Sequence, residues 1–401
     1  MKTEDYAKVA ILGVRAVALA WFMSAGEIGA EVQLFDNLGS LHHEITTASE
    51  RAQKFFDQGL RLVYAFNHEE AIAAFTEASR IDPEAPMPYW GVALSLGPNI
   101  NAAMDPKAEP RARDALHRAS LRLLGATPRE RAYVEAMAAR YSRQRSRKSK
   151  DGAYAKAMRS LATDYPDDVD AATLAAESMM LLRPWDYWRI DGRPQPGTEE
   201  FVAILQSALQ RNPDHPGACH YYIHAVEASP DPSRALDCAK RLSSLMPGAG
   251  HLVHMPAHIY MRLGFYREAS EHNGSAATVD EEYLAQNRLQ GNYAAGYYGH
   301  NLHFLNASLM MEGRSAEALQ IGQDLLTKVS HEEMAREPAL EWYAPTVFLT
   351  LARFGHWNDL IRQPPPPKGL RFTVGLWHYA RGLAFAATTR FGSAEGELSN
   401  L

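Results

Sequence analysis

Residues 52–85 read AQKFFDQGLRLVYAFNHEEAIAAFTEASRIDPEA, and this stretch decides the fold. Its apolar residues recur with the period of an amphipathic helix over two consecutive segments. Gly59 in the first segment and Ala71 and Ala78 in the second are small, which lets two helices cross closely. Pro83 cannot continue a helix and ends the second segment. The stretch therefore predicts a pair of packed helices.

The same frame of small residues recurs along the chain, whereas strand signals are nearly absent. Residues 86–215 also have helical periodicity, although they fit the frame poorly. The frame resembles the tetratricopeptide repeat family, which has units of about 34 residues. The resemblance predicts an all-α fold, a tetratricopeptide-type α-solenoid that forms a right-handed superhelix of antiparallel helix pairs. Further units begin at residues 216, 250, 299, 341 and 375.

Three parts are expected along the chain. Residues 1–44 are a leader, or a degenerate signal segment, together with a first helix. Residues 45–215 are N-terminal repeats, and residues 216–401 are C-terminal repeats with a histidine-rich groove. The apolar run 9–23 is interrupted by Arg15, so it is too short and too broken for a membrane span. It meets some requirements of a secretory signal, and both a periplasmic or exported and a cytoplasmic location stay open.

Composition excludes several classes of function. The chain has 401 residues and a formal net charge of −6, which argues against a general nucleic-acid binder. Two cysteines, Cys219 and Cys238, are too few for a disulfide framework. The sequence also lacks a glycine-rich phosphate loop, a nucleophile elbow and an H-E-x-x-H motif.

Histidine pairs carry the main chemical signal. Spacings of four, four and three residues place the two members of each pair on one helix face. Imidazole is the commonest metal-binding side chain, and two on one face can share an ion. The pairs are His220 with His224, His254 with His258, and His300 with His303.

The repeat resemblance aligns these histidines. In the family, positions 2, 5, 9 and 12 of each first helix line the concave groove, where ligands bind. Three consecutive units would then direct histidines into one groove, together with Glu227. Pro256 is expected to interrupt this pattern, leaving His251 and His254 in a loop and His258 in the first turn of a helix. The predicted metal ligands are His220, His224, His251, His254, His258, His300 and His303.

A nitrogen-rich ligand set excludes calcium and magnesium and favours copper over iron or zinc. Seven histidines exceed one tetrahedral shell, so two ions are considered. Glu227 is the expected acid–base residue, and Tyr297 a hydrogen-bond donor beside the metal. Trp185 and Trp188 are candidates for a lid. Asn273, Asp280 and Asn301 are candidate partners of the ligands, and His42, His43, His68 and His117 are interpreted as surface or structural residues.

Three functions remain in competition. The leading hypothesis is a metalloenzyme that oxidises a small organic substrate. The second is a zinc hydrolase in which metal-bound water attacks and Glu227 acts as the base. The third is a non-enzymatic scaffold that binds a peptide or protein partner in its groove, because fold alone does not decide function.

Overall fold

The structure, a computed structural model, describes residues 32–142, 146–287 and 293–401. These ranges are helical and contain no strand, only two isolated bridges. The expected all-α class is therefore confirmed for the described chain. The apolar run considered as a signal lies outside it. No helix in the described ranges is long and apolar enough to cross a membrane.

The stretch 52–85 forms two helices, as expected, and Asn67 begins the second by accepting a hydrogen bond from the Glu70 backbone N–H. Gly59 is required at the crossing because a Cβ there would lie 2.6 Å from the ring of Phe75. The helices of residues 50–211 are α2 (Glu50–Tyr64), α3 (His68–Ile81), α4 (Pro86–Ser95), α5 (Glu109–Ser120), α6 (Pro128–Arg140), α7 (Arg147–Asp164), α8 (Val169–Met180) and α9 (Thr198–Arg211).

The predicted unit starts at residues 216, 250 and 299 coincide with the first residues of helices, whereas those at 341 and 375 fall inside later elements. The short 3₁₀ segments are η1 (Pro106–Ala108), η2 (Pro232–Ala235) and η4 (Pro338–Tyr343), and η3 (Tyr293–Tyr298) is a π-helical turn. The α-helices are α10 (Pro216–Val226), α11 (Leu236–Leu245), α12 (Gly250–His254), α13 (Pro256–Leu263), α14 (Tyr266–Asn287), α15 (Gly299–Glu312), α16 (Ser315–Lys328), α17 (His331–Arg336), α18 (Thr346–Arg353), α19 (Trp357–Ile361), α20 (Arg371–Ala387) and α21 (Phe391–Ser399).

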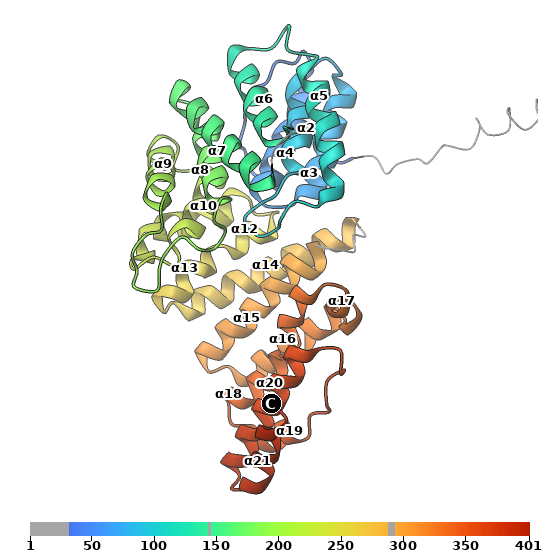
Figure 1. The fold of residues 1–401 in the computed structure, drawn as a ribbon, viewed down its shortest axis with the longest axis vertical. Helices are drawn as coiled ribbons and strands as arrows, with labels where there is room; N and C mark the ends of the chain where they lie inside the picture. The colour runs from blue at the N-terminus through green and yellow to red at the C-terminus, as the bar shows by residue number, and fades with distance from the viewer. Residues whose placement is uncertain (1–31, 143–145, 288–292) are drawn as a thin grey trace, which may run out of the picture. The chain divides into compact units, whose positions relative to one another are not determined.

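Helices that follow one another in the sequence mostly pack side by side, as α6, α7 and α8 do in Figure 1. Some contacts join segments that are distant in the sequence. In one of them, α10 packs on α2. Gly217 permits this approach, since a Cβ there would lie 2.4 Å from the ring of Tyr64. The turn after α2 is thereby brought against the histidine-bearing face of α10.

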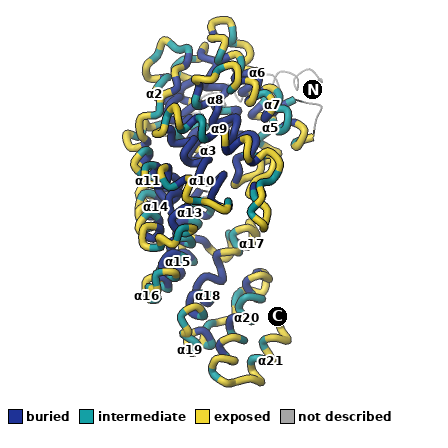
Figure 2. The backbone as a smooth tube through the Cα atoms, turned by 90° about the vertical axis from the view of Figure 1, so that its left-hand side faces the viewer, coloured by how far each residue is buried: buried dark blue, intermediate teal, exposed yellow. Residues whose placement is uncertain are grey.

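Burial differs sharply along the chain. Every residue of α10 is buried, and so is α13 from Pro256 to Tyr260, whereas α21 has no buried residue; Figure 2 colours the backbone accordingly. Cys219 and Cys238 are both buried and unpaired by a disulfide, in keeping with core positions. The histidine-bearing helices therefore belong to the most enclosed part of the described chain.

Candidate metal centre

Six of the seven predicted ligands meet in the folded chain. They fall into two groups in which the ligand atoms lie within 4.8 Å of one another. The groups adjoin, because the ring centroids of His224 and His258 are 5.3 Å apart. Group 1 is His220, His224 and His251, and group 2 is His254, His258 and His300.

Pro256 changes the local structure without moving the histidines out of the site. The proline begins α13, where its missing N–H does no harm. The residues before it form a separate short helix, α12, so His251 and His254 are helical and the expected loop is wrong. His258 lies in the first turn of α13, as expected.

Four of the six imidazoles are held through Nδ1. His220 Nδ1 lies 2.6 Å from the carbonyl oxygen of Tyr64, which can only accept. His254 Nδ1 lies 2.5 Å from Asn273 Oδ1, and the Asn273 Nδ2 donates to a backbone carbonyl, which fixes the orientation of the amide. Each Nδ1 therefore carries the proton and each Nε2 presents a lone pair.

Glu227 holds the remaining two. Its Oε1 accepts from His224 Nδ1 at 2.8 Å, and its Oε2 accepts from His258 Nδ1 at 2.7 Å. One carboxylate thus connects the two groups, a common arrangement behind metal-bound histidines. Burial opposes the charge, but the two histidines hold the pKa of Glu227 well below its usual range.

The Nε2 atoms point at one another. His254 Nε2 and His258 Nε2 are 2.9 Å apart, although both nitrogens carry lone pairs. His220 Nε2 and His251 Nε2 are 3.1 Å apart, and because His251 Nδ1 has no partner in the described chain, His251 Nε2 can carry a proton and donate to His220. His224 Nε2 has no hydrogen-bond partner among the described residues. The facing lone pairs of His254 and His258 repel each other unless a cation lies between or beside them. The arrangement therefore fits a bound metal better than a set of hydrogen bonds.

Burial favours the neutral form of five of these imidazoles by lowering their pKa. Desolvation is the largest cause lowering the pKa of His220, His224, His251 and His254, and neighbouring histidines lower it further. The pKa of His300 is lowered to about 3 for the same reasons. Neutral imidazole is the form that binds metal.

Aromatic residues line the centre. Tyr297, in the π-helical turn, has its ring centroid 4.9 Å from that of His251, and its hydroxyl lies 3.4 Å from Asn99 Nδ2. Burial raises the pKa of Tyr297 to about 12, so it keeps its proton at neutral pH. Phe66, which sequence reasoning missed, lies 4.5 Å from His220 between ring centroids and has a φ of 59°.

Of the two tryptophans predicted as a lid, Trp185 lies against the centre and Trp188 does not. Trp185 has a φ of 63°, is 49% exposed, and lies edge-on to His224 with ring centroids 4.9 Å apart. Trp188 instead anchors the loop, since its Nε1 donates to the carbonyl of Ala225. Left-handed backbone in a bulky residue is strained, and such strain often occurs near functional sites.

Other predicted residues lie apart from the two groups. His303 Nδ1 accepts a hydrogen bond from Trp342 Nε1 at 3.2 Å, and His303 belongs to neither group. Among the three candidate partners, Asn273 holds a ligand. Asp280 and Asn301 bond to each other, with 2.6 Å between Nδ2 and Oδ2.

A second buried histidine cluster surrounds Asp170. The carboxylate accepts from His43 Nδ1, His215 Nε2 and the Tyr64 hydroxyl, at 2.8, 3.0 and 2.6 Å. His215 Nδ1 in turn accepts from the Ala218 backbone N–H and begins α10. These bonds are compatible with a structural role for His43, although its Nε2 has no partner in the described chain and His43, Asp168 and Asp170 also lie close enough to hold an ion.

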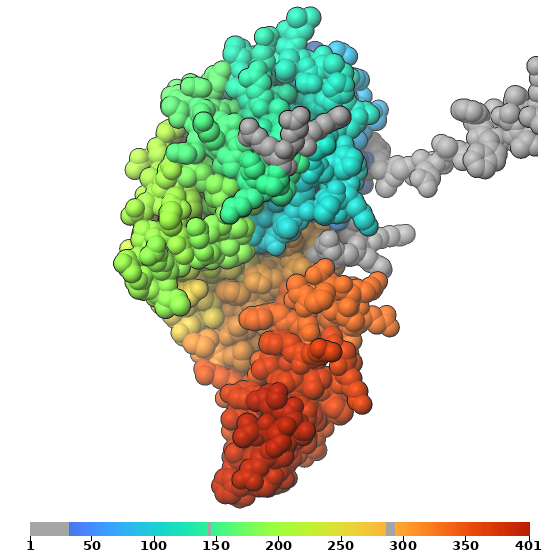
Figure 3. Space-filling model, viewed as in Figure 1, coloured from blue at the N-terminus to red at the C-terminus, as the bar shows by residue number. Residues whose placement is uncertain are grey.

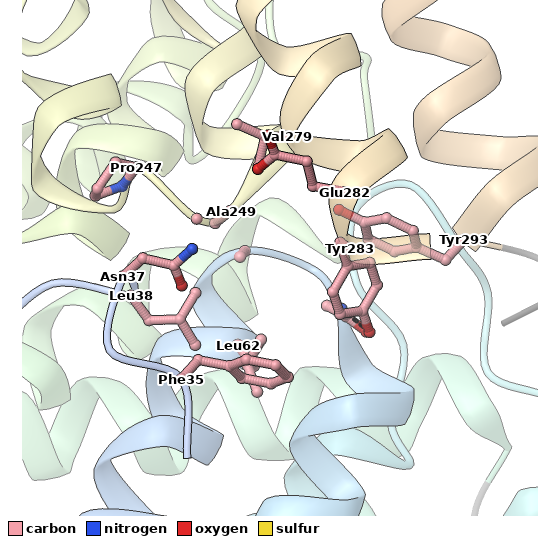
Figure 4. A pocket seen from close by; sticks show the side chains of 13 residues that line it. Phe35, Asn37, Leu38, Leu62, Pro247, Ala249, Val279, Glu282, Tyr283 and Tyr293 are labelled. Carbon is pink, nitrogen blue, oxygen red and sulfur yellow. Dashed lines mark hydrogen bonds between the residues drawn. The ribbon is translucent and has the colours of Figure 1, made fainter. Parts of the chain in front are cut away.

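A small cavity of about 80 Å³ lies near Tyr297 of the metal centre. Figure 4 shows the side chains that line it. Tyr293 lines it, and the ring of Tyr293 is 5.6 Å from that of Tyr297. No histidine is among its described lining residues. The cavity therefore adjoins the aromatic wall of the centre and is not the centre itself.

Comparison with known proteins adds no assignment. No protein-family model matches the chain, and no curated protein is similar to it. The function must be inferred from the geometry of the centre. Six imidazoles, four of which present Nε2 lone pairs because their Nδ1 atoms are bonded, are suited to bind transition-metal ions, and the described centre offers neither thiolate nor an uncommitted carboxylate.

Proposed function

We propose that this protein is a metal-dependent oxidoreductase whose histidine groups bind two transition-metal ions, with copper favoured over iron or zinc. One observation carries the proposal. His254 and His258 present their Nε2 lone pairs to each other at 2.9 Å, while Asn273 and Glu227 occupy their Nδ1 atoms. A shared or adjacent cation turns this repulsion into two ligand bonds.

The ligand chemistry supports copper. Each group offers three imidazoles to one ion, which leaves a coordination position open for a reactant. Non-haem iron prefers two histidines and a carboxylate, and both oxygens of Glu227 already accept from histidine. The same bonds weaken the zinc hydrolase alternative, because Glu227 holds two histidines and has no free oxygen to act as a base.

The overall reaction is a two-electron oxidation with dioxygen as the oxidant. A small organic substrate gives up two electrons and two protons, and dioxygen takes up both and leaves as hydrogen peroxide. Bound copper would supply the one-electron redox chemistry. In this scheme Tyr297 donates a hydrogen bond beside His251, Trp185 covers His224, and Glu227 positions His224 and His258.

We further propose that the centre lies in the groove of a tetratricopeptide-type solenoid. Packing between consecutive helices supports this arrangement, as do the helices that begin at three of the five predicted unit starts. The peptide-scaffold alternative is less favoured, because His220 and His254 are 0% exposed and His224 is 2% exposed. An extended peptide needs an open groove surface, whereas these side chains are enclosed.

Elemental analysis tests the proposal. Protein purified without a histidine tag should contain about two transition-metal ions per chain, one for each group. A copper form should show a paramagnetic signal that disappears with reductant and returns with oxygen. Protein that takes up no copper, iron or zinc at micromolar concentrations would contradict the proposal and favour the scaffold. Full occupancy by zinc without response to oxygen would favour the hydrolase.

A further inference from the structure

A second unusual site lies among α6, α7 and α8. Arg140 ends α6 and is 0% exposed, with its Cζ 4.2 Å from the centre of the Tyr154 ring in α7. Within the described ranges, no acceptor lies within hydrogen-bonding distance of its Nε, Nη1 or Nη2. A buried guanidinium with no acceptor is strongly unfavourable. The site therefore calls for a partner that the described chain does not supply.

Asp151 makes an ion pair with Arg140 but no hydrogen bond, and the fully buried guanidinium does not reach the surface. Asp151 Oδ1 is 3.8 Å from Arg140 Nε, too far for a hydrogen bond, and Asp151 is already bound by both Nε and Nη2 of Arg147. The Arg140 side chain points into the fold. A Cβ added to Gly97 would lie 3.1 Å from Arg140 Nη1, so the loop after α4 passes directly against the guanidinium.

A buried acid lies close by without pairing to Arg140. Glu177 on α8 is 4% exposed, and its Oε2 has no hydrogen-bond partner in the described chain. Burial raises the pKa of Glu177 to about 7, although the charge of Arg140 opposes the rise. The hydroxyl of Tyr154 also lacks a partner there. Arg140, Glu177 and Tyr154 are thus all buried and each has at least one polar atom without a hydrogen-bond partner in the described chain.

We propose that Arg140, Tyr154 and Glu177 form a binding site for a small amino acid or a similar zwitterionic molecule. The ligand carboxylate accepts from the guanidinium and from the Tyr154 hydroxyl, and its amine donates to Glu177. Two buried charges of opposite sign that do not pair with each other are satisfied together by a ligand carrying both complementary charges. Guanidinium groups bind carboxylates well because their donors match the two oxygens.

This site adjoins the histidines. Burial raises the pKa of Tyr221 on α10, and the charge of Glu177 raises it further, while the Tyr221 ring stacks on His220 with 5.3 Å between centroids. A bound amino acid would therefore lie close to group 1. Its use as the substrate of that centre rests on the proposed function, whereas its binding does not.

Thermal unfolding and calorimetry with three matched probes test the binding. Metal-free full-length protein is titrated with alanine, with propionate, which lacks the amine, and with ethylamine, which lacks the carboxylate. Alanine should raise the Tm, propionate should bind about tenfold more weakly, and ethylamine should have no effect. No response to alanine, or equal binding of alanine and propionate, would overturn the proposal.

Variants sharpen the test. Arg140→Met should abolish the alanine effect and still fold, because an apolar side chain replaces a buried cation whose donors make no hydrogen bond. Tyr154→Phe, which removes only a hydroxyl, should weaken binding, and Glu177→Gln should abolish the preference for alanine over propionate. Arg118→Met is the control, since Arg118 is exposed and pairs with Asp114. An alanine effect that persists unchanged in Arg140→Met would refute the site.

Metal measurements separate the two proposals. Protein that binds copper but not alanine would contradict the amino-acid site alone. Protein that binds alanine but no metal would contradict the oxidoreductase alone.

Discussion

Two buried histidine clusters in this chain have opposite hydrogen-bonding patterns. Around Asp170, two histidines and a tyrosine direct N–H and O–H donors at one carboxylate. In groups 1 and 2, four imidazoles direct their Nδ1 protons outward to Glu227, Asn273 and the Tyr64 carbonyl, and their Nε2 lone pairs point inward. In the first cluster protein donors occupy both oxygens of Asp170, although His43 Nε2 has no partner in the described chain, whereas in the second cluster lone pairs face one another. Burial alone does not distinguish a structural histidine from a metal ligand, but the direction of the proton does.

The largest effect is expected when the hydrogen bonds around Asp170 are broken. Asp170→Asn removes the charge and leaves at least one of three buried donors without an acceptor. We expect the free energy of unfolding to fall by about 3–5 kcal/mol, as for other broken buried pairs. Chemical denaturation measures this loss. Folded Asp170→Asn protein should still bind metal, and a variant as stable as the parent would refute the structural role.

A substitution in group 2 should instead change metal affinity and leave the stability of the metal-free protein nearly unchanged. His254→Gln replaces one of two facing lone pairs by an amide that can donate to His258 Nε2. We expect metal affinity at group 2 to fall by about 100-fold or more, with little change in the stability of the metal-free protein. Copper titration and thermal unfolding of the same samples give both quantities. His303→Gln is the matched control, because His303 belongs to neither group.

A smaller effect is expected from the carboxylate that joins the groups. Glu227→Gln can still accept one imidazole proton but no longer supplies a charge to two. Loss of such an outer partner typically weakens metal binding about 10–100-fold. Competition with a chelator of known affinity measures the change. Unchanged affinity together with a large loss of turnover would instead support Glu227 as the catalytic base.

The smallest effect concerns pH. Burial opposes protonation of His43, but Asp170 raises its folded-state pKa above 6.5. The stabilisation is therefore present below about pH 6.5 and is lost as the pH rises through the folded-state pKa. The stability difference between the parent and Asp170→Asn should shrink between pH 6 and pH 8. A difference that grows over this range would contradict the assigned hydrogen bond.

The sequence was informative where periodicity and spacing determine position. The helix pair at 52–85 and convergence of six histidines follow from residues that repeat at helical intervals. His303 could not be separated from His300 in this way, because its bond to Trp342 depends on a helix turn about 40 residues away. Phe66 was missed for a similar reason, since its left-handed backbone follows from local packing and not from residue type.

The opposite protonation of the two clusters was also beyond sequence reasoning. His43 and His215 look no different from His220 and His224 in a list of histidines. Their tautomers are set by acceptors that come from other helices, namely Asp170 on α8 and the Tyr64 carbonyl at the end of α2. Only the three-dimensional contacts reveal which nitrogens remain available.

The strained position of Trp185 gives the chain an optical reporter. Its indole lies 4.9 Å from the His224 ring, so a paramagnetic ion in group 1 should quench its fluorescence. Trp342 lies beside His303 instead and should stay bright, which provides an internal reference. Filling and emptying of the centre could then be followed by light emission in unlabelled protein, and Trp185→Phe would remove the responsive part of the signal.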